Sequence, residues 1–203
     1  MPNIIKIGVD IDDILLPFND GFIKLVNKKL NTDFKIHNWS SRVLEDETKY
    51  SKEMIFELLD EFSFSKEAKE VTPIFGAIES IEKMNNLGCE LYAITARPLY
   101  LEKETKELIK KHFHNHFKEV YHLGSRKKGE YLKVDKGIFS KEFGINIFIE
   151  DSLKNSLDIA QHNIPVILLD NPWNQEENLP ENIFRVKDWN EILQKIEELK
   201  NII

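Results

Sequence analysis

Short apolar runs that end abruptly at polar residues recur four times along the chain. The first covers residues 4–9, is rich in β-branched side chains, and ends at Asp10-Ile11-Asp12-Asp13. The other three cover 89–94, 145–149 and 164–169, and they are followed by Thr95-Ala96-Arg97-Pro98, Glu150-Asp151 and Asp170-Asn171-Pro172. Short continuous apolar runs bounded in this way predict strands that are buried on both faces.

Between these runs the apolar residues follow helical spacing. Helices are predicted over 74–87, where Gly88 provides a stop, and over 101–113, 152–162 and 188–199. Lys136 stands directly before 137–143, where a further helix is expected to start. Strands that alternate with helices predict an α/β fold with a mostly parallel sheet.

The segment 17–72 interrupts this alternation. It is helix-rich over 18–30 and 51–62, with an irregular stretch over 31–50 between them. We interpret 17–72 as an inserted helical cap domain, and 1–16 together with 73–203 as the α/β core domain.

Composition narrows the class of protein. With 203 residues, 31% charged and 41% apolar, the chain fits one soluble domain with a modest insertion, and no run approaches the roughly 18 apolar residues of a membrane span. Its net charge of −7 argues against binding polymeric nucleic acid. A single cysteine, Cys89, excludes an intrachain disulfide and a cysteine-built zinc site, and it suits a reducing cytoplasm. The oligomeric state is left open, with a homodimer as one option.

Five carboxylates follow the predicted strands. If the strands that end at Asp10, Thr95 and Glu150 are neighbours in the sheet, the following acids crowd together: Asp10, Asp12, Asp13, Glu150 and Asp151. Such a cluster repels itself strongly unless a hard divalent cation binds to its oxygens, which predicts a Mg²⁺ site.

Phosphoryl transfer uses the other polar residues of this edge. The Thr95 hydroxyl can donate to a phosphoryl oxygen, and Lys136 can neutralise its charge, with Lys133 as the alternative lysine. Because Mg²⁺ takes only one or two carboxylates, one acid can be left free to act as a nucleophile or an acid. The set of residue types is that of an enzyme of phosphoryl transfer.

On these residues the chain resembles the haloacid dehalogenase superfamily of phosphatases. Its four motifs are matched by Asp10-Ile11-Asp12-Asp13-Ile14-Leu15, Ile94-Thr95, Lys136 and Glu150-Asp151. The resemblance implies a Rossmann-like, three-layer core with a small cap inserted after the first strand. It also implies a phosphomonoester hydrolase that works through an aspartyl-phosphate.

The resemblance carries roles over to individual residues. Asp10 becomes the nucleophile and Asp12 the general acid and base, while Thr95 and Lys136 hold the transferring phosphoryl group. The Mg²⁺ ligands become Asp10, the backbone carbonyl of Asp12, and Asp151, with Glu150 in support. An acid at Asp12 favours phosphate esters over halides, because an alkoxide leaving group needs a proton.

Within the superfamily the chain is most similar to the 5′(3′)-deoxyribonucleotidases and their bacterial and phage relatives. The similarity rests on residues 10–18, Thr95-Ala96-Arg97-Pro98, Ile149-Glu150-Asp151-Ser152 with Asn155, and Asn171-Pro172-Trp173-Asn174. It implies a nucleotide substrate, with Phe18 against the base and Thr95, Ala96, Arg97 and Lys136 as further contacts. Asp13 stands where those enzymes often have glycine. Other aromatic candidates in the cap are Phe22, Phe34, Trp39, Tyr50, Phe56, Phe62 and Phe64.

Alternatives stay open for several of these residues. Arg97 either grips a substrate anion or forms an ion pair, and Asp13 and Ser152 can serve as helix caps. His112, His114 and His116 fit a helix end better than a metal site. The substrate can be another small metabolite, such as a sugar phosphate or phosphoglycolate. A non-catalytic phosphate-binding or receiver-like module is a further option, although a receiver places its acidic residues in a different order.

Overall fold

Seven strands form one sheet in the part of the chain that the computed structural model describes, residues 4–36, 50–127, 130–133 and 135–202. The strands are β1 (Lys6–Val9), β2 (Glu90–Pro98), β3 (Phe117–Lys127), β4 (Glu130–Lys133), β5 (Ile147–Glu150), β6 (Val166–Leu169) and β7 (Ile183–Val186). Their order is β4-β3-β2-β1-β5-β6-β7. Every neighbouring pair is parallel except β3 and β4, which form an antiparallel edge.

The four apolar runs of the sequence are β1, β2, β5 and β6, as predicted. One detail of the prediction is wrong, because β2 does not turn at Thr95 but continues to Pro98 with a shift in its pairing to β3. Gly124 of β3 allows this close approach, since a Cβ atom there would lie 2.0 Å from the carbonyl oxygen of Ala96.

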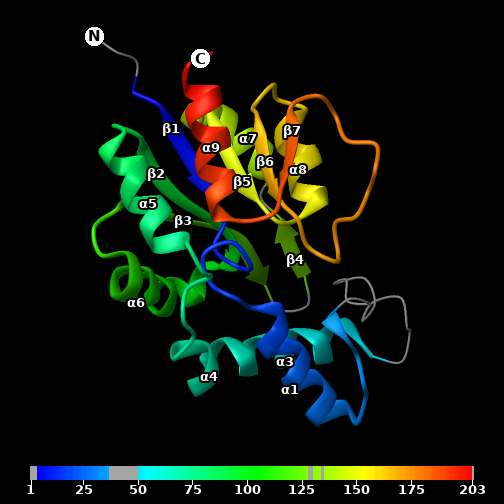
Figure 1. Cartoon of the computed structure of the whole chain (residues 1–203). Coiled ribbons are helices and arrows are strands. Elements are labelled where there is room, and N and C mark those ends of the chain that lie inside the picture. Colours follow the sequence, from blue (N-terminus) through cyan, green and yellow to red (C-terminus); the bar gives the residue numbers. More distant parts are fainter. Residues whose placement is uncertain (1–3, 37–49, 128–129, 134, 203) are drawn as a thin grey trace.

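Helices cover both faces of the sheet. On one face lie α5 (Ala77–Asn86), α6 (Glu102–Phe113) and α9 (Trp189–Lys200), whose apolar side chains share a core with β1 and β5. On the other lie α7 (Lys136–Phe143) and α8 (Leu153–Ala160). Figure 1 shows α9 in front of the sheet and α8 behind it. The three-layer α/β fold expected from the sequence is therefore confirmed. No helix in the described ranges is both long and apolar enough to cross a membrane.

Three helices of the segment 17–72, the helical segment, lie beyond the carboxyl ends of the strands. They are α1 (Asn19–Leu30), α3 (Lys52–Phe64) and the short α4 (Lys66–Lys69). Their buried side chains form an apolar cluster of their own, made of Phe22, Ile23, Val26, Ile55, Leu58 and Phe62. The chain leaves the sheet after Leu16 and returns at Ile74, whose N–H donates to the carbonyl of Leu15 at 3.0 Å. Trp39, one of the aromatic candidates, lies outside the described residues.

Candidate active site

Three neighbouring strands bring the polar residues of the sequence motifs to one edge of the sheet. β1 lies between β2 and β5, as the carboxylate argument requires. Asp10 follows β1, and its N–H donates to the carbonyl of Ile149 at 3.0 Å, which ties the two strand ends together. Asp10, Glu150 and Asp151 are all buried, and each offers an oxygen within 4.8 Å of the others.

Lys136 is the cation that faces these acids. It is the first residue of α7, a helix capped by Asp135, and it is 1% exposed. Its Nζ lies 3.0 Å from Asp10 Oδ1 and 2.8 Å from Glu150 Oε2. The same nitrogen stands 5.4 Å from the centre of the Phe148 ring. Lys136 therefore lies within the acidic cluster, whereas Lys133 belongs to the edge strand β4.

The three acids differ in how many of their oxygens are already engaged. Both oxygens of Glu150 accept hydrogen bonds, Oε2 from Lys136 and Oε1 from Asn155 Nδ2 at 3.0 Å and from the Ser152 N–H at 3.2 Å. Asp151 uses Oδ2 to accept from Trp173 Nε1 at 2.8 Å. Asp10 Oδ1 is buried and accepts no well-directed hydrogen bond from the described residues, although the Lys136 ammonium is near. Asp10 and Asp151 are thus the acids with oxygen available for a ligand.

Burial and mutual repulsion dominate the electrostatics of the cluster. Burial, followed by the charge of Glu150, raises the pKa of Asp10 to about 8, and burial raises the pKa of Asp151 well above its usual range. Burial alone would lower the pKa of Lys136, but Asp10 and Glu150 outweigh it and raise that pKa. One ammonium therefore faces three carboxylates, a charge set that a divalent cation would balance.

The other two acids of the motif have hydrogen-bond partners of their own. The Asp12 carboxylate pairs with Arg97, with Nη2 to Oδ1 at 2.6 Å and Nε to Oδ2 at 3.1 Å. Asp13 caps α1, because its Oδ1 accepts from the N–H groups of Phe18 at 2.9 Å and Asn19 at 3.1 Å. The expectation that five carboxylates crowd at one point therefore holds for three, since Asp12 and Asp13 have their own partners. The capping role considered for Asp13 is found, and Ser152 likewise caps α8.

The remaining candidates lie around the same edge. Thr95 is 1% exposed, and its Oγ1 accepts from the N–H of Arg97 at 3.1 Å. Ala96 is half-buried and presents its carbonyl to Gly124. Phe18 packs edge-on against Phe62, with ring centres 5.0 Å apart, and is only partly buried.

Comparison with known proteins decides the family. Residues 3–201 match the family described as 5′ nucleotidase, deoxy (pyrimidine), cytosolic type C protein. The chain belongs to this family. With its site and fold, that membership makes it a phosphomonoester hydrolase of the haloacid dehalogenase superfamily.

Individual relatives agree with this assignment. The chain is 28% identical to an inferred nucleotidase from Bacillus cereus, over 92% of its own length and 95% of the relative's. The solved structure of a protein from Clostridium acetobutylicum, described as a predicted phosphatase, has the same fold. Its TM-score is 0.71 at 16% identity, over 96% of this chain and 99% of that one. A haloacid dehalogenase-like hydrolase from Streptococcus pneumoniae also has this fold, with a TM-score of 0.68 and 18% identity over 95% of this chain and 98% of that one.

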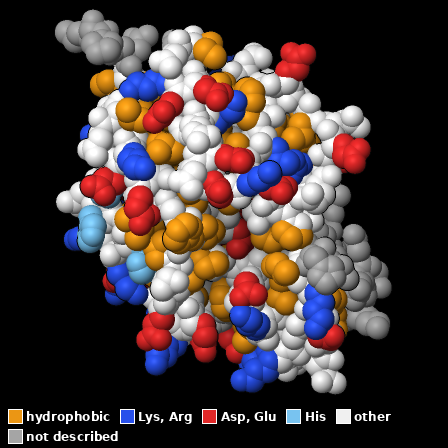
Figure 2. Space-filling view, viewed as in Figure 1, with side chains coloured by type: hydrophobic (Ala, Val, Ile, Leu, Met, Phe, Trp, Pro, Cys, Tyr) orange, Lys and Arg blue, Asp and Glu red, His pale blue; other side chains and the backbone are white. Residues whose placement is uncertain are grey.

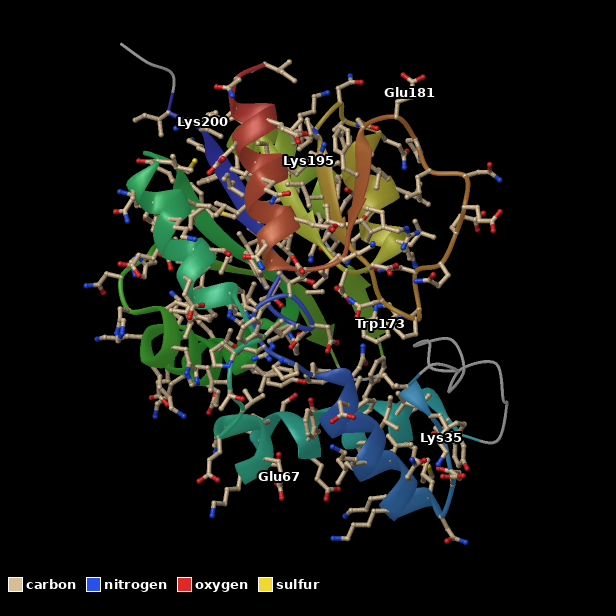
Figure 3. The ribbon with its side chains drawn as sticks, in the orientation of Figure 1. Lys35, Glu67, Trp173, Glu181, Lys195 and Lys200 are labelled. Atoms are coloured by element: carbon tan, nitrogen blue, oxygen red, sulfur yellow. The ribbon has the colours of Figure 1, made fainter. Side chains whose placement is uncertain are left out.

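The loop after β6 contributes to the site of this family member in a way that the sequence does not reveal. Asn174 Nδ2 donates to the backbone carbonyl of Asp151 at 2.7 Å, beside the bond from Trp173. Arg185 of β7 holds the same loop through Asn174, the Asp170 carboxylate and the Glu176 carbonyl. Figure 3 shows Trp173 at the end of this loop that faces the helical segment. Arg185 carries no motif, and only its position in the unpredicted strand β7 explains its role.

A groove adjoins the site on the side of this loop. It has a volume of about 420 Å³ and is lined in part by Asp13, Pro17, Ile74, Phe75 and Trp173. Hydrophobic side chains gather around a hollow near the middle of the face shown in Figure 2. The groove lies where the chain crosses between the sheet and the helical segment.

Proposed function

We propose that the protein is a Mg²⁺-dependent nucleotidase that hydrolyses a nucleoside monophosphate through an aspartyl-phosphate on Asp10. The observation that carries the proposal is the environment of Asp10. Asp10 directly follows the central strand β1. Its carboxylate lies 3.0 Å from the Lys136 ammonium and has a buried oxygen, Oδ1, without a directed hydrogen bond.

The donor set fits a hard cation. Asp10 and Asp151 supply carboxylate oxygens, and the backbone carbonyl of Asp12 is the third proposed ligand. Glu150 supports the site indirectly, because both of its oxygens already hold Lys136, Asn155 and the Ser152 N–H. When bound, Mg²⁺ would neutralise charge on the phosphoryl oxygens and offset the repulsion between the acids.

The chain's own residues supply the remaining chemistry. An oxygen of Asp10 attacks phosphorus, and the bond between phosphorus and the leaving oxygen breaks as Asp12 gives that oxygen a proton. In the second half a water molecule attacks the phosphorus of the aspartyl-phosphate, Asp12 takes its proton, and the Asp10 carboxylate is released. The Thr95 hydroxyl and the Lys136 ammonium bind phosphoryl oxygens in both halves.

A nucleotide is the substrate class that family membership and the inferred nucleotidase of Bacillus cereus support best. We assign the helical segment 17–72 as a cap over the strand ends, with Phe18 as the aromatic contact to the base. Thr95, Ala96 and Lys136 remain the proposed contacts to the phosphate. The single buried cysteine supports a cytoplasmic location.

The test compares the wild-type protein with Asp10→Asn on p-nitrophenyl phosphate and a panel of deoxynucleoside, ribonucleoside and sugar phosphates. We expect Asp10→Asn to lose at least about a thousandfold in kcat on every substrate, because the nucleophile is gone. The matched control is Asp33→Asn, which changes an exposed aspartate of the helical segment. Removal of Mg²⁺ with a chelator should abolish the wild-type rate, and added Mg²⁺ should restore it.

Two results would separate the parts of this proposal. Wild-type rates in Asp10→Asn would remove the aspartyl-phosphate mechanism altogether. If no nucleotide ranks among the best substrates while sugar phosphates or phosphoglycolate do, the nucleotidase proposal fails and the phosphomonoester hydrolase stands.

A further inference from the structure

The structure points to Arg97 as a positioning residue that fixes the carboxylate of Asp12 for proton transfer. This inference rests on the proposed function, in which Asp12 is the general acid and base. It replaces the expectation that Arg97 grips a substrate anion, because the guanidinium is already engaged by Asp12.

The contact is a two-pronged fork. Arg97 Nη2 lies 2.6 Å from Asp12 Oδ1, and Arg97 Nε lies 3.1 Å from Oδ2 and 3.2 Å from Oδ1. A planar guanidinium that engages both oxygens of a carboxylate fixes the plane of that carboxylate as well as its position. Asp12 stands in the loop after β1 and has no other side-chain anchor among the residues that the structure describes.

Arg97 is itself held from three elements. Its Nη1 donates to Thr105 Oγ1 of α6 at 3.3 Å, and Thr105 is completely buried. Its N–H donates to Thr95 Oγ1, within β2, and its carbonyl lies 3.3 Å from Nδ1 of His122 on β3. The guanidinium is therefore a fixed support for Asp12. The backbone N–H of the same arginine also holds the Thr95 hydroxyl, which is a proposed phosphate contact.

The pair differs from an ordinary surface ion pair. Its side chains are 15% and 28% exposed, and they join the nucleophile loop to the second motif across 85 positions of the chain. Exposed pairs that lack such geometry contribute little to stability. A partly buried, bidentate pair at the catalytic edge has the geometry to orient a reacting group.

The chemistry predicts a selective defect when Arg97 is removed. In the first step Asp12 gives its proton to the leaving oxygen as the P–O bond breaks. A nucleoside alkoxide needs that proton, whereas p-nitrophenolate leaves without it. Loss of Arg97 should therefore lower kcat/KM, which reports this first step, for the nucleotide and leave kcat/KM for p-nitrophenyl phosphate nearly unchanged. The second step is common to both substrates and also uses Asp12, so kcat alone does not separate them.

The experiment measures kcat and KM of wild type, Arg97→Gln and Arg97→Lys on thymidine 5′-monophosphate and p-nitrophenyl phosphate. We expect Arg97→Gln to lower kcat/KM on the nucleotide about 10- to 100-fold, part of the contribution of a general acid. The kcat/KM on p-nitrophenyl phosphate should fall less than about threefold, since substrate binding is intact and the leaving group needs no proton. Arg97→Lys, which keeps the charge but not the fork, should show the same selectivity more weakly.

Two comparisons make this result specific. In an Asp12→Ala background, Arg97→Gln should cause no further loss on the nucleotide, because the residue that it positions is absent. Arg185→Gln removes a similar arginine from the loop beside Asp151, and it should affect both substrates by the same factor.

The ratio of the two rates is measured within one protein sample, so it does not depend on the fraction that folds. An equal loss of kcat/KM on both substrates would overturn the positioning role and assign Arg97 to phosphate binding. Failure of the proposed function is distinct, because it requires that wild type cleave no phosphomonoester or that Asp10→Asn stay active.

Discussion

Asp13 shows how one residue joins the loop after β1 to the helical segment. Its backbone has a φ of 56°, in the left-handed region that non-glycine residues occupy at a cost. In return its carboxylate accepts from the N–H groups of Phe18 and Asn19 and caps α1. Burial raises the pKa of this carboxyl to about 7. The glycine that related nucleotidases often have here would relieve the backbone but would lose the cap.

Substitutions at Asp13 should separate these two effects. Asp13→Gly loses the cap, worth about 1 kcal/mol, while Asp13→Ala also keeps the left-handed penalty of about 1–2 kcal/mol. We therefore expect the free energy of unfolding, measured in urea, to be lower for Asp13→Ala than for Asp13→Gly by at least about 1 kcal/mol. Any relief of repulsion among the acids is common to both variants. Equal stabilities would show that the backbone conformation carries no cost.

The sequence predicted the individual residues of the site well where the proposed chemistry requires a particular residue type. Asp10, Glu150, Asp151 and Lys136 meet as expected, because parallel strands place their carboxyl ends at one edge. It could not predict the partner of Asp12, since the fork to Arg97 depends on β2 continuing past Thr95. Nor could it place Phe18, whose neighbours Phe22 and Phe62 come from two helices of the segment.

Between elements, the packing of β1 beside β5 supports Lys136, the lysine that we propose binds the phosphoryl group. A Cβ atom on Gly8 would lie 2.6 Å from the ring of Phe148, so only glycine leaves room for that ring. The same ring stands beneath the Lys136 ammonium. Gly8 of the central strand thus makes room for the ring that lies against the Lys136 ammonium.

Gly8→Ala should test this chain of contacts. We expect a loss of about 1–3 kcal/mol in the free energy of unfolding, because an added methyl group overpacks the core, together with a lower kcat on p-nitrophenyl phosphate. Phe148→Leu in the same protein should recover part of both losses by making room. Additive effects in this double-mutant cycle would contradict the proposed contact.

The loop after β6 should control metal affinity through Trp173. Trp173→Phe removes the N–H that holds Asp151 Oδ2, and loss of such a partner typically weakens metal binding about 10- to 100-fold. The Mg²⁺ concentration that half-saturates the rise in melting temperature should increase by that factor. Trp189→Phe is the matched control, since its indole donates to the Ile14 carbonyl in the core and its loss should lower stability alone. An unchanged Mg²⁺ midpoint in Trp173→Phe would contradict the role.

Element prediction succeeded for apolar strands and failed for polar ones. β6 is fully apolar, and β1 and β5 each carry one charged residue at an end, Lys6 and Glu150, so the apolar runs of these strands are plain in the sequence. β3 mixes polar and apolar residues near the edge of the sheet, and its last three residues, Ser125 to Lys127, are all polar. Edge strands bury less apolar surface, so their sequences carry a weaker signal.

Across the whole molecule, the helical segment has a core separate from that of the sheet. Gly21 of α1 lets Phe62 of α3 approach closely, since a Cβ atom there would lie 2.6 Å from the Phe62 ring. Phe62 is 5% exposed and also contacts Phe18 and Phe22. Two crossings, after Leu16 and before Ile74, join this cluster to the sheet.

Phe62→Ala should therefore loosen the helical segment and leave the sheet intact. Removal of a buried phenylalanine costs about 3–5 kcal/mol, and we expect this loss in the hydrogen-exchange protection of α1 and α3. Amides of β1 and β5 should keep their protection. Phe64→Ala, on the same helix but 44% exposed, is the matched control and should change little. Equal loss of protection in segment and sheet would show that they unfold as one unit.

The position of β1 has a consequence for synthesis on the ribosome. Of the strands in this sheet, the central one is made first, yet its parallel partners begin at Glu90 and Ile147. A nascent chain therefore leaves one edge of β1 unpaired until β2 is made and the other until β5 is made, and pairings so distant in sequence form slowly. The acids of the site come together only when β5 closes beside β1, so the acidic cluster and the middle of the sheet are completed in the same folding event.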